Sequence, residues 1–171
     1  MNVIVPDSCI YIGSQFSGAV FSRDQLYRYL LWRRWSLHLP VLVFTMLNPS
    51  VANAIEDDRT ITRCRGFAND HSYGGIAVVN AFGFVSTKPK VMFAAADPVG
   101  PDNDAIIRQV VANADVVLAH GPPAAHLGRD VTLLVLMQSV GARTHVLRLT
   151  SSGYPEHPLY LPKSCRMLAY P

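Results

Sequence analysis

Cysteine, lysine and long hydrophobic runs are scarce in this chain, and each shortage excludes a class of protein. The three cysteines, Cys9, Cys64 and Cys165, lie far apart and form no C-x-x-C pair. A disulfide framework or a cysteine-rich zinc or iron–sulfur centre is therefore not expected. The longest apolar runs, such as Val131 to Met137, fall far short of the roughly 20 residues that span a bilayer. The first residues, Met-Asn-Val-Ile-Val-Pro, lack a basic start and an apolar signal stretch, so we expect a cytoplasmic protein without a membrane partner.

The chain is mildly basic, and arginine supplies most of the positive charge. The formal net charge is +3, and among the 15 basic residues only Lys88, Lys90 and Lys163 are lysine. Arginine binds phosphate through a planar, bidentate fork. Between residues 141 and 171 the only acidic residue is Glu156, against four basic residues. The composition favours a phosphate-bearing partner, and a solvated basic face is the alternative.

Apolar, β-branched runs alternate with helical patterns over most of the 171 residues, a length that suits one domain. Strands are expected at 3–12, 19–21, 41–46, 76–80, 115–119 and 144–149. Helices are expected at 24–35, 60–69, 105–113 and 129–140. This alternation indicates an α/β fold. We expect a three-layer sandwich with a mostly parallel, roughly four-stranded central sheet and an N-terminal hairpin, forming a single domain over residues 1–171.

Four short polar motifs follow apolar runs, at the points where predicted strands end. They are Met46-Leu47-Asn48-Pro49-Ser50, Val78-Val79-Asn80-Ala81-Phe82, Ala119-His120-Gly121 and His157-Pro158-Leu159-Tyr160-Leu161. The carboxyl ends of parallel strands form one rim of an open sheet, and ligands bind at that rim. We therefore expect the motifs to surround one cleft.

Asn48 and His157 are the candidate catalytic residues. An asparagine is too weak a base to deprotonate water, so Asn48 would position a water molecule or the substrate. Ser50 and nearby N–H groups would bind a phosphate, and Pro49 would contact the substrate. His157 is stiffened by the prolines near it and would stabilise negative charge on a leaving group. The alternatives are a strand-ending turn at Asn48 and a structural role for His157.

Other polar residues are candidates for binding the substrate. The amide of Asn80 has two donors and one acceptor, which match the Watson–Crick edge of a pyrimidine, although it could instead satisfy backbone groups in a loop. His120 is expected to line the cleft. Ser151 and Ser152 precede a glycine and would form a phosphate-binding turn.

We expect no metal and no cofactor. The histidines show no metal-ligand spacing, and the glycine-rich signatures of nucleotide cofactor sites are missing. Asp97, Asp102 and Asp104 could bind a cation, but the prolines and glycine among them favour turns and helix caps.

Together the motifs resemble those of the uracil-DNA glycosylase superfamily. In that family a first strand ends in Asn-Pro or Asp-Pro and positions the water, a second ends in Leu-Leu-Asn and reads the pyrimidine, and a third ends in Trp-Gly. A His-Pro-Ser motif follows the fourth strand. The corresponding segments are Leu47-Asn48-Pro49-Ser50, Val78-Val79-Asn80, His120-Gly121 and His157-Pro158-Leu159, spread over residues 40–162. The chain departs from the family pattern at Ser50, His120, Leu159 and Tyr160.

The chain looks closer still to a bacterial and phage family of unknown function. The shared stretches are Met46 to Ser50, Asp57-Asp58-x-Thr60, Asp97-Pro98-Val99-Gly100-Pro101 and His157-Pro158-Leu159-Tyr160-Leu161.

The glycosylase resemblance implies a monofunctional N-glycosylase, a hydrolase that flips a normal or modified pyrimidine into the cleft and cleaves its N-glycosidic bond. Asn80 would read the base, Phe82 or Phe84 would stack on it, and Tyr160 of the last motif would contact the substrate. The expected partner is DNA or a pyrimidine nucleotide, and the expected state is a monomer. Two alternatives stay open: a non-catalytic binder of nucleic acid or nucleotide, and an enzyme acting on free or modified nucleotides.

Overall fold

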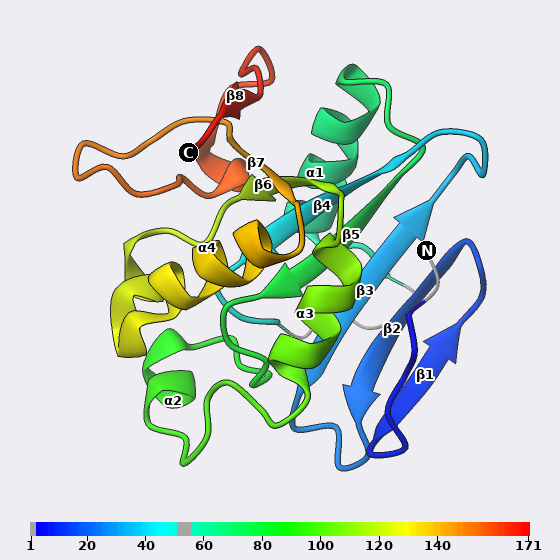
Figure 1. The fold of residues 1–171 in the computed structure, drawn as a ribbon, viewed down its shortest axis with the longest axis vertical. Helices are drawn as coiled ribbons and strands as arrows, with labels where there is room; N and C mark the ends of the chain where they lie inside the picture. Colours follow the sequence, from blue (N-terminus) through cyan, green and yellow to red (C-terminus); the bar gives the residue numbers. More distant parts are fainter. Residues whose placement is uncertain (1–2, 51–55) are drawn as a thin grey trace.

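A computed structural model describes residues 3–50 and 56–171 of the chain. Over these residues the strands form one mixed sheet in the order β1-β2-β3-β5-β4-β6-β7-β8 (Figure 1). The strands are β1 (Cys9–Gly13), β2 (Ser17–Ser22), β3 (Arg28–Arg34), β4 (Val41–Met46), β5 (Gly75–Asn80), β6 (Asp115–Leu118), β7 (Arg143–Val146) and β8 (Leu168–Ala169). The helices are α1 (Arg59–Asp70), α2 (Pro89–Phe93), α3 (Asn103–Val111) and α4 (Arg129–Ser139), with 3-10 segments η1 (Pro122–Gly128) and η2 (Pro158–Tyr160).

The expected fold class is wrong, because the sheet is neither roughly four-stranded nor mostly parallel. It has eight strands in the described residues, and the pairs β1–β2, β2–β3, β3–β5 and β7–β8 are antiparallel. Parallel pairing is limited to β5–β4, β4–β6 and β6–β7. The N-terminal hairpin β1–β2 therefore continues the sheet through β3 instead of standing apart from it.

The largest single error is the helix expected at residues 24–35, where the chain forms β3. This strand is covered on both faces, since Leu30 packs in one hydrophobic cluster and its neighbour Leu31 in the other. A strand buried on both faces loses the apolar–polar alternation that identifies a half-exposed strand. The apolar spacing of Leu26 and Leu30 then mimics a helical face.

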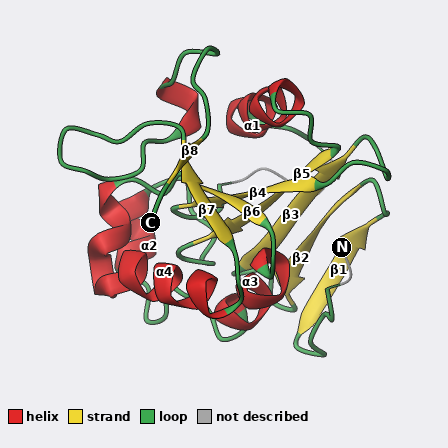
Figure 2. Ribbon diagram, turned by 45° about the horizontal axis from the view of Figure 1, so that its top comes forward, coloured by secondary structure: helices red, strands yellow, loops and turns green. Residues whose placement is uncertain are grey.

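The sheet separates two hydrophobic clusters. The cluster on the α1 side includes Phe44, Phe67 and Val78, and the cluster on the side of α3 and α4 includes Val43 and Ile107. Figure 2 shows α1 on one side of the sheet and α2, α3 and α4 on the other. Because side chains alternate along a strand, each residue at the end of β4 or β5 is assigned to one of these two faces by its position.

The segment after β7 returns along the α1 side of the sheet. Leu149 pairs with Pro155 to close a loop, η2 follows, and β8 then pairs antiparallel with β7. Arg63 of α1 donates hydrogen bonds to the carbonyls of Pro158 (3.5 Å) and Leu161. These contacts hold η2, and with it the histidine before it, against α1.

Candidate functional site

The loops that follow the parallel strands are tied together at one edge of the sheet. We call this edge the rim and define it as residues 47–50, 80–86, 119–121 and 155–161. The backbone bonds that join these loops, at 2.8–3.0 Å, run from Ala81 N to Met46 O, from Phe82 N to Leu47 O, from Ser86 N to Pro49 O and from Gly121 N to Pro155 O. The four sequence motifs therefore meet at this edge.

Asn48 is held in one orientation by two carbonyl groups. Its Nδ2 donates to the carbonyl of Ser86 at 2.7 Å and to that of Pro49 at 3.1 Å. Since both partners are acceptors, the amide nitrogen must face them and Oδ1 must face the other way. Asn48 therefore presents a fixed acceptor oxygen, the geometry that positioning a water molecule requires.

Asn80 is the last residue of β5 and lies opposite Met46 of β4. Its side chain lies on the α1 face, because Ile76 and Val78 at alternate positions pack in the α1-side cluster. Only 2% of Asn80 is exposed, and its Nδ2 has no hydrogen-bond partner among the described residues. A buried donor left unsatisfied costs about 1–3 kcal/mol, so such groups in a native fold indicate strain or a ligand site.

Asp58 connects the first motif with α1. Its Oδ1 accepts the backbone N–H of Ile61 at 2.8 Å and so caps the helix, and its Oδ2 accepts the hydroxyl of Ser50 at 3.2 Å. The hydroxyl of Ser50, expected to contact a phosphate, is thus occupied by a carboxylate in this structure.

His157 presents a protonated ring nitrogen. The backbone N–H of Leu159 donates to its Nδ1 at 3.3 Å, so the proton of the neutral ring is on Nε2. Burial lowers the pKa of His157, and the negative charge of Asp58 opposes that shift. The residue before it is anchored by a two-bond ion pair, from Arg148 Nε and Nη2 to the carboxylate of Glu156 at 2.7 and 2.9 Å. At neutral pH the site therefore has an uncharged imidazole with an N–H donor.

Arg28, at the start of β3, brings a buried cation to this part of the sheet. It is 4% exposed, and its backbone N–H bonds the carbonyl of Gly83 just beyond β5. Burial lowers the pKa of Arg28 to about 10, while the charge of Asp58 opposes the shift. Asp58 is thus within electrostatic range of both Arg28 and His157, which gathers an acid, a cation and an imidazole on the α1 side.

His120 differs from His157 in its tautomer. It is 5% exposed, and its Nδ1 pairs with the carbonyl of Gly121 at 3.2 Å, which places the proton on Nδ1. Burial lowers the pKa of His120. It belongs to the rim as an uncharged residue with Nε2 as an acceptor.

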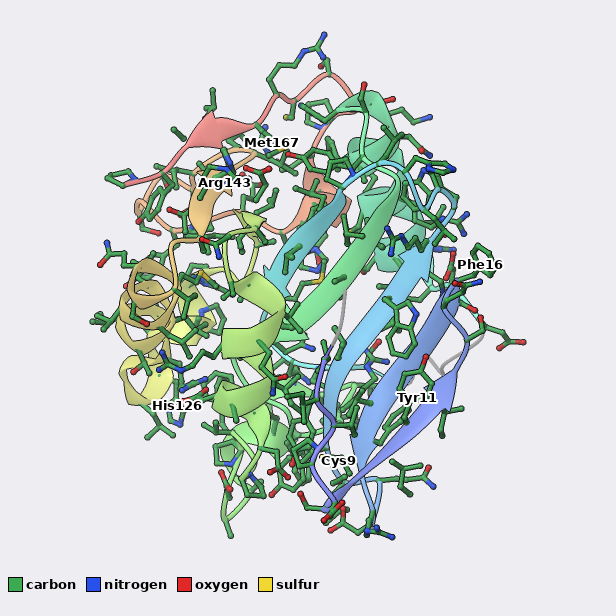
Figure 3. All side chains as sticks on the ribbon, turned by 45° about the vertical axis from the view of Figure 1, so that its right-hand side comes forward. Cys9, Tyr11, Phe16, His126, Arg143 and Met167 are labelled. Carbon is green, nitrogen blue, oxygen red and sulfur yellow. The ribbon has the colours of Figure 1, made fainter. Side chains whose placement is uncertain are left out.

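The remaining expected substrate contacts are not gathered with this group. Phe82 is fully buried on the opposite face, 5.6 Å from the ring of Phe93 and 6.1 Å from that of His126, which Figure 3 labels beside α4. Ser151 and Ser152 lie in the exposed loop closed by the Leu149–Pro155 pair. Tyr160 is 71% exposed, with its ring 5.6 Å from that of His157.

The aspartate-rich connector supports the rim from behind. Asn103 Nδ2 donates to the carbonyls of Asn80 (3.0 Å) and Ala81 (3.4 Å), and Arg129 Nε also donates to the carbonyl of Ala81 (2.9 Å). Arg129 is fixed by both oxygens of Asp104, at 2.6 and 3.0 Å. Asn103 and Arg129 therefore hold the end of β5 in place, and this is the structural role of the segment that contains Asp97, Asp102 and Asp104.

Turns and helix caps were the favoured prediction for Asp97, Asp102 and Asp104, with a cation site as the alternative. Asp97 lies in such a turn, because its Oδ1 accepts the backbone N–H groups of Val99 and Gly100, both at 3.0 Å. Over residues 3–50 and 56–171, no group of three or more His, Cys, Asp or Glu side chains could hold a metal ion. None of the helices in those ranges is long and apolar enough to cross a membrane.

Sequence reasoning missed Arg28 and Asp58 as site residues. Arg28 was hidden because its segment was expected to be an amphipathic helix. Asp58 precedes a predicted helix, where a negative charge is favourable, but that pattern does not reveal its bond to Ser50. The stretch Asp57-Asp58-x-Thr60 was the available signal, because the sequence resemblance included it together with the rim motifs.

Comparison with known families gives one match. The family described as "Protein of unknown function (DUF1643)" matches residues 28–159, which include all of the rim motifs except the end of the last one. A search of curated proteins found no match, and neither did a search of solved structures. A relationship to the uracil-DNA glycosylase superfamily is not indicated by these comparisons.

Proposed function

This chain belongs to the DUF1643 family, and we propose that it binds a pyrimidine nucleotide at the rim and hydrolyses its N-glycosidic bond. The observation that carries the proposal is the amide of Asn80. It is buried, it lies on the same face as Asp58 and His157, and its Nδ2 is unused among the described residues. A pyrimidine carbonyl is an acceptor that would satisfy this donor.

Three residues have complementary roles in the proposed reaction. Asn80 binds the edge of the base. His157 donates its Nε2–H to the base oxygen on which negative charge develops as the bond from C1′ to the base nitrogen breaks. Asn48 holds a water by Oδ1, and the oxygen of that water bonds to C1′. The base leaves with the bonding electron pair and gains the proton of the water, so the products are a free pyrimidine and a sugar with a 1′-hydroxyl.

The charge distribution supports a short or single-stranded substrate over a long duplex. Duplex binding needs many cationic contacts to phosphates. Most described arginines instead bind groups within the chain, namely Arg23, Arg33, Arg34, Arg63, Arg65, Arg108, Arg129, Arg143 and Arg148. The same observation favours a second candidate, an enzyme acting on free or modified nucleotides. In either case we propose a cytoplasmic, monomeric protein.

A cleavage screen tests the proposal. Single- and double-stranded oligonucleotides with uracil, mismatched thymine or 5-substituted pyrimidines would be incubated with the protein and heated in alkali, and free mononucleotides would be assayed in parallel for base release. Asn48→Ala and His157→Ala should lower turnover by about 10²–10⁴-fold. Asn48→Ala also loses two hydrogen bonds to carbonyls, so its melting temperature should fall by a few degrees while the protein stays folded at the assay temperature. His38→Ala, an exposed histidine outside the rim, is the matched control.

The outcomes separate the candidates. Cleavage of an oligonucleotide supports a glycosylase, and base release from mononucleotides alone supports the second candidate. Full activity in both Asn48→Ala and His157→Ala would exclude the assigned site. Salt-sensitive binding without any base release would refute hydrolysis and leave a binding protein.

A further inference from the structure

The segment before β1 covers a hollow on the α3 side of the sheet. Val3 and Val5 line this hollow and pack against the cluster on that side, whereas Ile4 between them is 79% exposed. Ile4 is fixed to α3 by two hydrogen bonds, from its backbone N–H to Gln109 Oε1 at 2.8 Å and from Gln109 Nε2 to its carbonyl at 3.2 Å. The segment thus forms a roof over this part of the sheet.

The space under the roof has a volume of about 420 Å³, which lies within the roughly 300–1,000 Å³ range of small-molecule sites. Its floor is apolar and includes Val20, Leu30 and Val41, from β2, β3 and β4. The hollow also reaches Ile76, the second residue of β5, whereas Asn80 is the last residue of that strand. At about 3.3 Å per residue these two lie about 13 Å apart. The hollow is therefore separate from the rim and lies on the side of the sheet opposite α1.

Two aromatic rings form one wall of the hollow. The ring centroids of Tyr11 and Trp32 lie 5.1 Å apart, and Figure 3 labels Tyr11 on β1. The hydroxyl of Tyr11 (3.1 Å) and Nε1 of Trp32 (3.0 Å) both donate to the carbonyl of Ser14 in the turn between β1 and β2. The indole lies over Gly18, where an added Cβ would approach Cζ2 of Trp32 to 2.3 Å. Both rings are thus held in place with their polar atoms already bonded, which leaves their apolar surfaces for a ligand.

Arg34 is the only charged residue that lines the hollow. Its Nε donates to the carbonyl of Ser36 and its Nη2 to that of Leu37, both at 3.0 Å, so the guanidinium is fixed against the turn after β3. Within residues 3–50 and 56–171, Arg34 forms no ion pair and its Nη1 donates no hydrogen bond. An arginine keeps its charge at physiological pH. The N–H groups of Nη1 are therefore available to an anion.

We propose that this hollow binds a small aromatic carboxylate. The ring of the ligand lies against Trp32 and over the apolar floor, and the carboxylate accepts hydrogen bonds from Arg34 Nη1. One positive charge with no acidic neighbour in the lining suits a monoanion, whereas a phosphate monoester carries up to about two negative charges. Because the hollow lies outside the rim, this inference goes beyond the proposed function and does not depend on it.

The test measures the affinity of the full chain for 2-naphthoate by titration calorimetry, with 2-naphthamide and acetate as partial ligands. The amide keeps the ring without the charge, and acetate keeps the charge without the ring. Hydrogen bonds to a charged group raise affinity about 10–100-fold, so 2-naphthamide should bind more weakly than 2-naphthoate by that factor. Acetate should not bind measurably, because it buries no ring surface.

Variants assign the two parts of the ligand to residues of the hollow. Arg34→Gln should weaken 2-naphthoate binding by about 10–100-fold without changing the affinity for 2-naphthamide, and Arg34→Lys should restore part of the loss. Tyr11→Leu should weaken binding of both ligands about 2–10-fold, whereas Tyr11→Phe, which keeps the ring, should bind them like wild type. Arg59→Gln is the matched control, since Arg59 is exposed and does not line the hollow. Melting curves check that each variant is folded.

Trp32 reports where the ligand binds. The chain has two tryptophans, so in Trp35→Phe the remaining one is Trp32, and 2-naphthoate should quench its fluorescence at the concentrations that calorimetry gives.

The absence of 2-naphthoate binding, or an equal affinity for 2-naphthamide, would overturn the proposal. So would a folded Arg34→Gln variant that loses no more affinity than Arg59→Gln. If Arg34→Gln does not fold, the comparison of the two naphthalene ligands on the wild-type chain decides the same question. Base release is not measured in any of these experiments, so their result is independent of the reaction proposed at the rim.

Discussion

Replacing Asn80 by leucine should separate stability from function. Leucine has the branched shape of asparagine but no polar atoms. Because Nδ2 of Asn80 is buried without a partner among the described residues, the substitution removes an unsatisfied donor instead of a hydrogen bond. The backbone carbonyl of Asn80, which accepts from Asn103, is retained.

The magnitude follows from the cost of an unsatisfied buried donor. Removing the unsatisfied donor therefore stabilises the fold by about 1–3 kcal/mol. The larger side chain of leucine destabilises the fold by about 1–3 kcal/mol, because it overpacks the same space. The expected net change therefore lies between a loss and a gain of about 2 kcal/mol. At about 2–4 °C per kcal/mol for a chain of this size, the melting temperature should move by no more than about 8 °C in either direction.

Asn103→Leu is the matched control, because Asn103 is also a fully buried asparagine. Its Nδ2 donates to the carbonyls of Asn80 and Ala81, so its loss leaves buried carbonyls with fewer donors. We expect a loss of about 1–3 kcal/mol from the lost hydrogen bonds, in addition to the same packing cost. Asn103→Leu should thus be clearly more destabilising than Asn80→Leu.

The assay combines thermal unfolding with ligand binding. Asn80→Leu should unfold at a higher temperature than Asn103→Leu and lose pyrimidine binding. A destabilisation as large as that of Asn103→Leu would show that the amide of Asn80 has a structural partner, and the reasoning for a ligand site would fail.

Three further expectations concern stability. Arg129→Met should cost about 2–4 kcal/mol in urea unfolding, because it removes donors from Ala81 and the partner of Asp104; a change below 0.5 kcal/mol, an order-of-magnitude bound for a neutral surface site, would contradict the bracing role. Phe82→Ala should cost about 3–5 kcal/mol, since the ring is fully buried, and a stable variant defective only in binding would instead place the ring at the substrate. The hydrogen bonds from Arg143 lower the pKa of Asp115 to about 2. Such a depressed pKa stabilises the fold above pH about 4, and the gain, at most about 2 kcal/mol, is lost as the pH falls towards 2; Asp115→Asn should therefore differ from wild type at pH 6 but not at pH 2.

The positions of three candidate site residues were more predictable from the sequence than the sheet was. Asn48, Asn80 and His120 lie at or just after the ends of β4, β5 and β6, where short connections keep them near the strand ends. His157 follows β7 only after residues 147–156. The pairing of strands is decided by contacts between distant segments. Residues 28–34 have no local signal for a strand covered on both faces, because that burial comes from clusters assembled elsewhere in the chain.

The roles of individual side chains were only partly predictable. The pattern of Phe82 is the same whether it faces a ligand or the core. Simple alternation beyond β5 would place Phe82 on the face of Asn80, and only the turn of the chain after Asn80 directs its ring into the core on the other side, against Phe93. The pair Asp57 and Asp58 is a similar case. Both precede a helix in the sequence, yet Asp57 pairs with Arg33 and Arg65, whereas Asp58 accepts the hydroxyl of Ser50.

The sequence by itself determined the local features of this protein: the strands β4 to β7, the turn at Asp97 and the polar residues at or just after the ends of β4, β5 and β6. These depend on the order of apolar and polar residues over a few positions, where backbone geometry and burial act directly. The tertiary structure alone decided the eight-strand order, the burial of Arg28 and the meeting of Asp58 with His157. Those features depend on which segments pack against each other, and the free energy of that packing is shared among residues far apart in the chain.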